Sequence, residues 1–244
     1  MGRGDPACEI CKGAAFRFMQ DPRTREVRQV VCQCAMAVYE AERAAYLREM
    51  CNVDEETLAR FTFDTFHPGK AAAPDGQVRR VRASMGEVKA ICEDFARAPR
   101  NWLVLAGNVG SGKSHLAFAI ANALLAKGVG VYWETMPELM DALRAGYKDG
   151  SYDERFNLMK RVPVLILDDL GTENASDWVT EKLFQLFNAR YLKAAPTVVT
   201  TNLDLETAEA KLSARVRSRL LDRKLSTVVQ LPAGDYRVAE GKAG

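Results

Sequence analysis

One stretch of eight residues has the pattern of a phosphate-binding loop. It runs from Gly107 to Ser114, reads G-N-V-G-S-G-K-S, and matches G-x-x-x-x-G-K-[ST]. Glycines let the backbone curl until successive N–H groups face an anion, and a helix that begins there adds the positive end of its dipole. We expect Lys113 to reach the β- and γ-phosphates of a nucleotide and the Ser114 hydroxyl to bind Mg²⁺.

An acidic pair follows a second apolar run. Asp168 and Asp169 come directly after Val-Leu-Ile-Leu at 164–167. That order places both carboxylates at the carboxyl end of a buried strand, where open parallel sheets bind ligands. Two carboxylates this close need a cation or a proton between them. We therefore expect Asp168 to hold Mg²⁺ through water and Asp169 to polarise the attacking water or help to hold it. Asn202, which ends the next strand, is expected to orient that water.

Four of the six cysteines lie within the first 34 residues: Cys8, Cys11, Cys32 and Cys34. The pairs C-x-x-C and C-x-C bracket two strand-like runs, as in a four-thiolate zinc ribbon, although the second pair is tighter than the usual spacing. A segment this short cannot bury a core alone, so a metal would supply folding free energy. Zn²⁺ held by four thiolates would be structural, because no coordination position stays open for water. Four free thiols are the alternative.

A basic stretch lies near the end of the chain. Residues 210–224 carry six basic side chains against one acidic side chain, for which a solvated helix face is the usual explanation. However, Arg215 and Arg219 are four residues apart and share a helical face. Such a face gives a rigid base to an arginine that reaches the γ-phosphate of a neighbouring subunit. Arg237, past the last strand, could reach back to its own nucleotide.

Strand-like and helix-like runs alternate along the second part of the chain. The alternation predicts a parallel sheet with helices on both faces. The fold class is therefore α/β, a P-loop NTPase core with a small zinc-ribbon-like and helical module before it. Expected strands cover 102–106, 131–134, 164–167, 197–202 and 227–231, and expected helices cover 78–98, 113–127, 137–145, 152–160, 177–194 and 204–221.

Shifts in composition divide the chain into three parts. We expect a zinc-binding and helical partner-interaction module over residues 1–52, a linker over 53–77, and the nucleotide-binding domain over 78–244. Cys51 and Cys92 stand alone in helix-like sequence, where a cysteine is usually a small buried hydrophobic residue.

The composition excludes other classes of protein. Of the 244 residues 48% are hydrophobic, enough for a core, and the net charge of +2 indicates no particular partner. No apolar stretch approaches the length of about 18 residues that a membrane span needs. The N-terminus lacks the apolar core of a signal peptide. We therefore expect no membrane interaction and a cytoplasmic location.

Together the motifs resemble those of AAA+ ATPases, specifically the DnaC-type helicase loaders and the closely similar IstB-type transposition ATPases. The resemblance covers about Phe61 to Arg237 and rests on 61–66, 107–116, 165–171, 200–202 and 215–220. It implies that Asp168 and Asp169 are the Walker B pair and that Asn202 is sensor 1. It also implies that Arg219 is the arginine finger, with Arg215 as the competing candidate, and that Arg237 is sensor 2. The residues assigned to the nucleotide are Asn108, Val109, Gly110, Ser111, Gly112, Lys113, Ser114, His115 and Arg237.

The resemblance further implies an activity. The chain is expected to hydrolyse ATP at the interfaces of a homo-oligomer and to load a DnaB-type replicative helicase onto single-stranded DNA. The N-terminal module would grip the helicase, and the basic helix would contact DNA phosphates. The alternative within the same family is an ATPase helper in DNA transposition, which shares every ATPase motif.

Two functions from other classes of protein fit the sequence less well. A small-molecule P-loop kinase needs an acceptor pocket, whereas the Asp-Asp and Thr-Thr-Asn patterns favour a hydrolase with a positioned water. A zinc adaptor with a non-hydrolysing nucleotide domain conflicts with the intact Lys113, Ser114 and Asp168.

Overall fold

The computed structural model describes residues 4–67, 81–82, 84–146, 152–171, 177–205, 207 and 212–232. The chain forms two compact units, Met1–Glu49 and Met50–Gly244, and the boundary falls in the last turn of helix α1 (Met36–Met50). The domain limits at 52 and 77 stay a prediction. No helix in the described ranges is both long enough and apolar enough to cross a membrane.

The first unit contains a β-hairpin and a helix. Strands β1 (Phe16–Gln20) and β2 (Val27–Val31) pair antiparallel, and the short 3-10 helix η1 (Gln33–Ala35) leads into α1. The carboxylate of Asp21 closes the hairpin turn, because it accepts hydrogen bonds from the backbone N–H groups two and three residues later.

Apolar side chains are unusually exposed in this unit. Phe18 is 74% exposed and Val27 is 64% exposed, and both belong to the hairpin. A single hairpin has too little partner surface to bury both of its faces. Of the ten exposed large hydrophobic side chains in the described part of the chain, eight belong to the first unit: Ile10, Phe18, Met19, Val27, Met36, Val38, Tyr39 and Tyr46.

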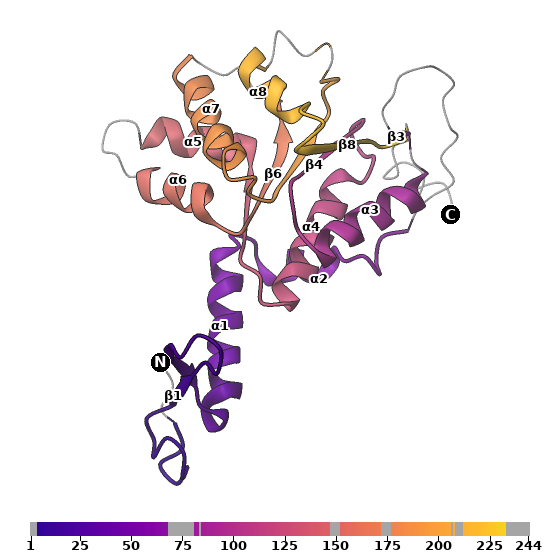
Figure 1. Ribbon diagram of the computed structural model, residues 1–244. Helices are drawn as coiled ribbons and strands as arrows, with labels where there is room; N and C mark the ends of the chain where they lie inside the picture. Colours follow the sequence, from indigo (N-terminus) through magenta and orange to yellow (C-terminus); the bar gives the residue numbers. More distant parts are fainter. Residues whose placement is uncertain are drawn as a thin grey trace. The chain divides into compact units, whose positions relative to one another are not determined.

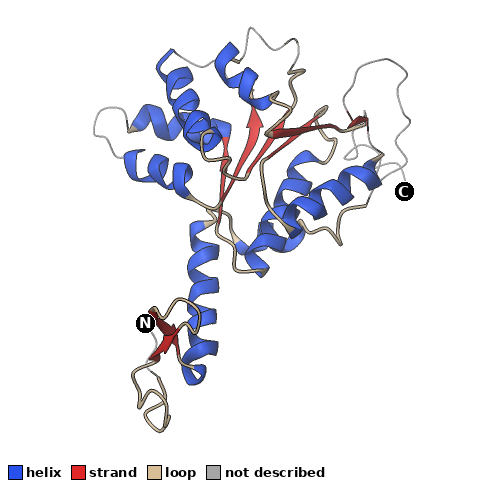
Figure 2. Ribbon diagram, in the orientation of Figure 1, coloured by secondary structure: helices blue, strands red, loops and turns tan. Residues whose placement is uncertain are grey.

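The second unit is built on a parallel sheet (Figure 2), as predicted. Every residue of its central strands β4 (Trp102–Ala106) and β7 (Thr197–Thr201) is buried, which explains why β4 is a continuous apolar run instead of an alternating one. In spatial order the strands are β3 (Val81–Arg82), β8 (Ser226–Gln230), β4 (Trp102–Ala106), β7 (Thr197–Thr201), β6 (Val164–Leu170) and β5 (Val131–Thr135).

Helices cover both faces of the sheet (Figure 1). One core lies between the sheet and α3 (Met85–Arg97) and α4 (Lys113–Ala126). The other lies between the sheet and the helices α5 to α8. The helices of this second core are α5 (Met136–Ala145), α6 (Tyr152–Arg161), α7 (Asp177–Tyr191) and α8 (Ala214–Leu220). Helix α2 covers Glu55–Arg60. Cys51 and Cys92 are fully buried in the first of these cores, as expected.

Two predicted helices begin too early. The helix predicted over 78–98 starts at Met85, because Ser84 and Glu87 form a capping box, and Val81–Arg82 instead pair with β8. The spacing S-x-x-E was present in the sequence as a signal for this start. The helical part of 204–221 that the structure describes is α8, which begins after a Ser213 cap.

A buried ion pair anchors α6 to the end of β5. Glu134 is fully buried and accepts hydrogen bonds from Arg155 and from the Tyr132 hydroxyl. Burial raises the pKa of the Glu134 carboxyl, and the charge of Arg155 acts in the opposite direction. The second carboxylate oxygen, Oε1, has no hydrogen-bond partner among the described atoms.

Candidate functional site

The loop predicted to bind phosphate connects β4 to α4 at the carboxyl edge of the sheet. Gly110 and Gly112 have φ angles of 76° and 88°, a left-handed conformation that glycine adopts without strain. Gly112 is also the N-cap of α4. A Cβ atom on Gly107 would lie 3.0 Å from both Leu231 and Ser111, so the loop is closely packed as well as tightly curled.

The buried polar atoms of this loop fit a triphosphate. Lys113 is only 5% exposed, and its Nζ atom donates to the carbonyl oxygens of Gly107 and Asn108 at 2.9 and 2.8 Å. The hydroxyl of Ser111 is buried and has no hydrogen-bond partner in the described part of the chain. A cation laid along a curled backbone at a helix N-terminus is the arrangement that anionic phosphates bind.

Side chains from two strands and a helix meet at Asp168. Its Oδ1 atom accepts hydrogen bonds from Ser114 on α4 at 3.0 Å and from Thr200 on β7 at 2.5 Å. Burial raises the pKa of the Asp168 carboxyl, while the two hydrogen bonds lower it. Carboxylate and hydroxyl oxygens are the ligands that Mg²⁺ prefers, so this set of donors fits that ion. The contribution of Thr200 was not predicted, since nothing in a strand sequence marks which hydroxyl faces a carboxylate.

Asp169 lies at an irregularity of strand β6. Its φ angle is 62°, and the pairing of β6 with β7 shifts register between Leu167 and Leu170. The backbone N–H of Asp169 donates to the Thr200 hydroxyl at 2.9 Å. A bulge of this kind re-aims side chains beside an active site, which frees the two carboxylates from strict alternation along the strand.

Asn202 follows the last residue of β7 and is exposed. The preceding residue, Thr201, accepts a hydrogen bond from the backbone N–H of Gly107 at 3.1 Å. The structure thus places Asn202 next to the start of the phosphate loop. Its role in orienting water stays a prediction.

The imidazole of His115 is turned toward an upstream segment. Its Nε2 atom lies 3.0 Å from the carbonyl oxygen of Thr62 and 3.3 Å from the hydroxyl of Thr65, and burial lowers the pKa of the ring. The rings of Phe61 and Phe66 meet it edge-on. Sequence reasoning assigned His115 to the nucleotide and missed these side-chain contacts, for which the aromatic alternation at 61–66 was the available signal.

The two candidate finger arginines both lie along helix α7. Arg219 donates to the side-chain oxygen of Asn188 at 2.7 Å and lies over the rings of Phe184 and Tyr191. Arg215 also lies over Phe184, but its side chain is 69% exposed. Both guanidinium groups thus contact helix α7, and Arg215 is the more exposed of the two. Arg237 falls outside the described residues.

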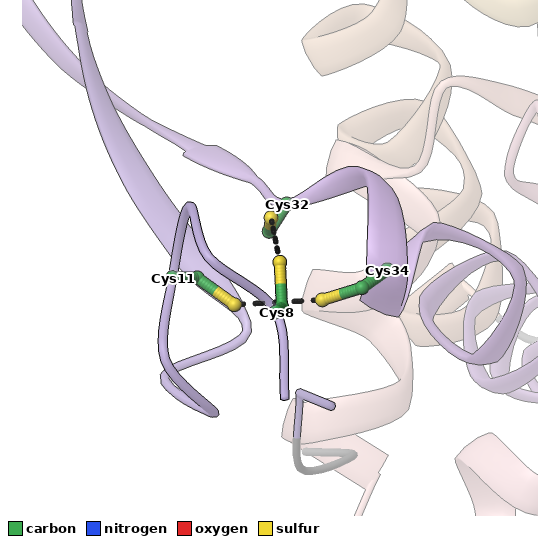
Figure 3. A group of neighbouring side chains, drawn as sticks. All are labelled: Cys8, Cys11, Cys32 and Cys34. Carbon is green, nitrogen blue, oxygen red and sulfur yellow. Dashed lines mark hydrogen bonds between the residues drawn. The ribbon is translucent and has the colours of Figure 1, made fainter. Parts of the chain in front are cut away.

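The four N-terminal cysteines converge (Figure 3). All four Sγ atoms lie within 4.8 Å of one another, with 3.7 Å between Cys8 and Cys32 and 3.4 Å between Cys11 and Cys34. Thiolates at about 2.3 Å from a tetrahedral Zn²⁺ stand about 3.8 Å apart. The cluster could therefore hold a metal ion, and its size fits zinc.

Comparison with known proteins places the second unit among ATP-binding proteins. Residues 84–242 match the family model of IstB-like ATP-binding proteins. The chain is similar to the insertion sequence IS5376 putative ATP-binding protein of Geobacillus stearothermophilus, with 30% identity over 74% of this chain and 69% of that protein. It is also similar to the replicative helicase loader DnaC of Escherichia coli K12, with 29% identity over 48% of this chain and 49% of DnaC.

Solved structures agree on the fold. A crystal structure of the DnaC helicase loader superimposes with a TM-score of 0.61 at 24% identity, covering 72% of this chain and 99% of that one. The chain spans between about half and two thirds of the length of the curated relatives named above.

Proposed function

Because the chain belongs to the IstB-like ATP-binding protein family, we propose that it is an ATP-driven loader of a replicative DNA helicase onto single-stranded DNA. In this proposal the chain hydrolyses ATP to ADP and phosphate at the interfaces of a homo-oligomer. The first unit, with zinc at its four cysteines, grips the helicase. The AAA+ fold of the second unit supports the hydrolytic part of the proposal.

Each site residue has a proposed task. Lys113 and the loop residues 108–115 bind the phosphates, and Ser114 and Asp168 hold Mg²⁺. When bound, the ion neutralises negative charge on the phosphates. Asp169 and Asn202 position the attacking water. Arg219 of a neighbouring subunit completes the site, and Arg237 contacts the nucleotide of its own subunit.

The observation that favours helicase loading is the first unit itself. It is a compact module ahead of the nucleotide-binding unit, it carries a cysteine cluster that could hold a metal ion, and it exposes many large apolar side chains. A small unit that exposes this many large apolar side chains is typical of a module that binds a protein partner. Two curated relatives of the chain are named replicative helicase loaders, which points to the helicase as that partner.

A helper in DNA transposition is the second candidate. The relative from an insertion sequence aligns with 74% of this chain, against 48% for DnaC. Both candidates use the same ATPase, so the nucleotide site does not separate them. They differ in the macromolecule that the oligomer holds: a helicase with single-stranded DNA in one case, and duplex DNA with a transposase in the other.

Co-purification with the host's replicative helicase tests the proposal. The tagged full chain is mixed with the helicase in ATP and Mg²⁺, and binding of single-stranded and duplex DNA of equal length is measured by fluorescence anisotropy. We expect capture of the helicase, preference for single strands, and loss of nucleotide-dependent assembly in Lys113→Ala. Failure to capture the helicase, combined with tighter binding of duplex DNA, would favour the transposition helper.

A further inference from the structure

The segment 58–66 packs on helix α4, the helix that begins at the phosphate loop. Asn122 on α4 donates to the carbonyl oxygens of Leu58 and Phe61 at 2.5 and 2.8 Å. One turn nearer the loop, the ring of Phe118 stacks on Phe61 with 5.3 Å between ring centroids. His115 precedes Phe118 by three residues and Asn122 by seven, so all three side chains lie on one face of the helix.

His115 lies at the phosphate-loop end of this face. A carbonyl oxygen can only accept a hydrogen bond, so the contact of Nε2 with the Thr62 carbonyl oxygen at 3.0 Å assigns the proton to that nitrogen. The rings of Phe61 and Phe66 stand edge-on to the imidazole, each with its centroid 5.1 Å away. The side chain is therefore held by residues of a single upstream segment.

Phe66 extends these contacts to the loop. It is buried, and its Cε2 atom lies 3.0 Å from the position that a Cβ atom on Gly112 would occupy. Gly112 has a left-handed backbone and caps α4, so its placement fixes where the first N–H groups of the helix point. The Phe66 ring occupies the space beside this glycine, and His115 contacts that ring.

We propose that the side chain of His115 is a positioning residue for the nucleotide. It holds Phe66 against Gly112 and so keeps the phosphate loop in its binding geometry, while its imidazole does not touch phosphate. The inference rests on the proposed binding of ATP at this loop. Coupling between two sites is reciprocal, so bound nucleotide also makes the segment 58–66 more ordered.

Binding of a fluorescent ATP analogue in the presence of Mg²⁺ tests this role on the full chain. His115→Ala and Phe66→Ala are each expected to weaken binding on the order of 10-fold, because each removes one link of the contact. The double variant is expected to lose about as much as either single variant, since neighbours in one contact chain are not additive. Hydrogen exchange of the segment 58–66 should slow when nucleotide binds to the wild type and not when it binds to His115→Ala.

Asn122→Ala is the matched control. It frees the same segment at the end of α4 away from the loop and should change affinity by less than about twofold. His115→Gln can still donate to the Thr62 carbonyl and should bind between the wild type and the alanine variant; it replaces His115→Ala if that variant does not fold.

Two outcomes would overturn the inference: wild-type affinity in the His115 variants, or an equal loss in Asn122→Ala, which would indicate a general packing effect. Wild-type chain that fails to bind the analogue would instead count against the proposed function as well.

Discussion

The hydroxyl of Ser114 donates a hydrogen bond to the buried carboxylate of Asp168, and so links the phosphate loop to a strand that is two positions away in the sheet. The two side chains proposed to hold Mg²⁺ are thus hydrogen-bonded to each other. Thr200 lies on β7, the strand between β4 and β6, and donates to the same oxygen of Asp168.

Removing either member of this pair should stop hydrolysis. Ser114→Ala and Asp168→Asn are expected to lower ATP turnover by at least about 100-fold, because charge stabilisation through a metal ion contributes several kcal/mol to the transition state. Phosphate release at a series of Mg²⁺ concentrations measures the effect. Thr200→Ser keeps the hydroxyl and is the control. Turnover close to the wild-type rate in Asp168→Asn would show that the carboxylate does not hold the ion.

The arginine that acts across the subunit interface can be identified by four variants. Arg219→Ala is expected to lower assembled turnover by ~10³-fold or more while nucleotide binding persists. It should also lower the melting temperature, because the guanidinium packs over the rings of Phe184 and Tyr191. Arg219→Lys keeps the positive charge, and Asn188→Ala removes only the hydrogen-bond partner of Arg219, so the two variants distinguish a loss of charge from a loss of packing. Arg215→Ala should leave turnover nearly unchanged. The reverse pattern, with turnover lost in Arg215→Ala and kept in Arg219→Lys, would make Arg215 the finger.

Metal removal should affect the two units differently. We expect about one zinc ion per chain, and its loss on chelation or in Cys11→Ser should unfold the first unit, since a small metal domain has little core of its own. Hydrogen exchange would then rise over residues 4–49 and stay unchanged around the phosphate loop. Cys92→Ala, which lies in the other unit, is the control. An equal zinc content in wild type and Cys11→Ser would argue against the site.

The buried carboxyl of Glu134 should make stability depend on pH. Burial raises its pKa above the ordinary value of 4.5. The folded state therefore binds the proton more tightly than the unfolded state, so this contribution to stability is complete below about pH 4.5 and is lost as the pH rises through the folded-state pKa. Chemical denaturation from pH 4.5 to 8 should show a steeper decline for the wild type than for Glu134→Gln. Parallel curves would mean that Arg155 fully compensates the burial of the charge.

The sequence was sufficient for features that local spacing specifies. The loop at 107–114, the acidic pair after a buried strand, and the parallel sheet follow from patterns a few residues long, and the structure confirms the sheet and the strand–loop–helix order. The predicted membership of the IstB-like family and its ATP-binding character are confirmed by the family match.

Contacts between residues that are far apart in the chain could not be predicted from the sequence. His115 meets Thr62 across 53 positions, and Arg219 meets Asn188 across 31. Helical periodicity indicated that Arg215 and Arg219 share a face, but it carried no information on which helix that face would meet. Periodicity likewise continued through Val81–Arg82, where the pairing with β8 prevails over local helical preference.

The apolar exposure of the first unit bears on how the protein has to be produced. A small unit that exposes large apolar side chains such as Phe18, Val27 and Tyr46 will associate with itself or with chaperones when no partner covers them. Expression of residues 1–49 alone should therefore give poorly soluble protein. The full chain should be more soluble when its partner is co-expressed with it. Solubility on co-expression is thus an inexpensive screen for the molecule that covers this surface.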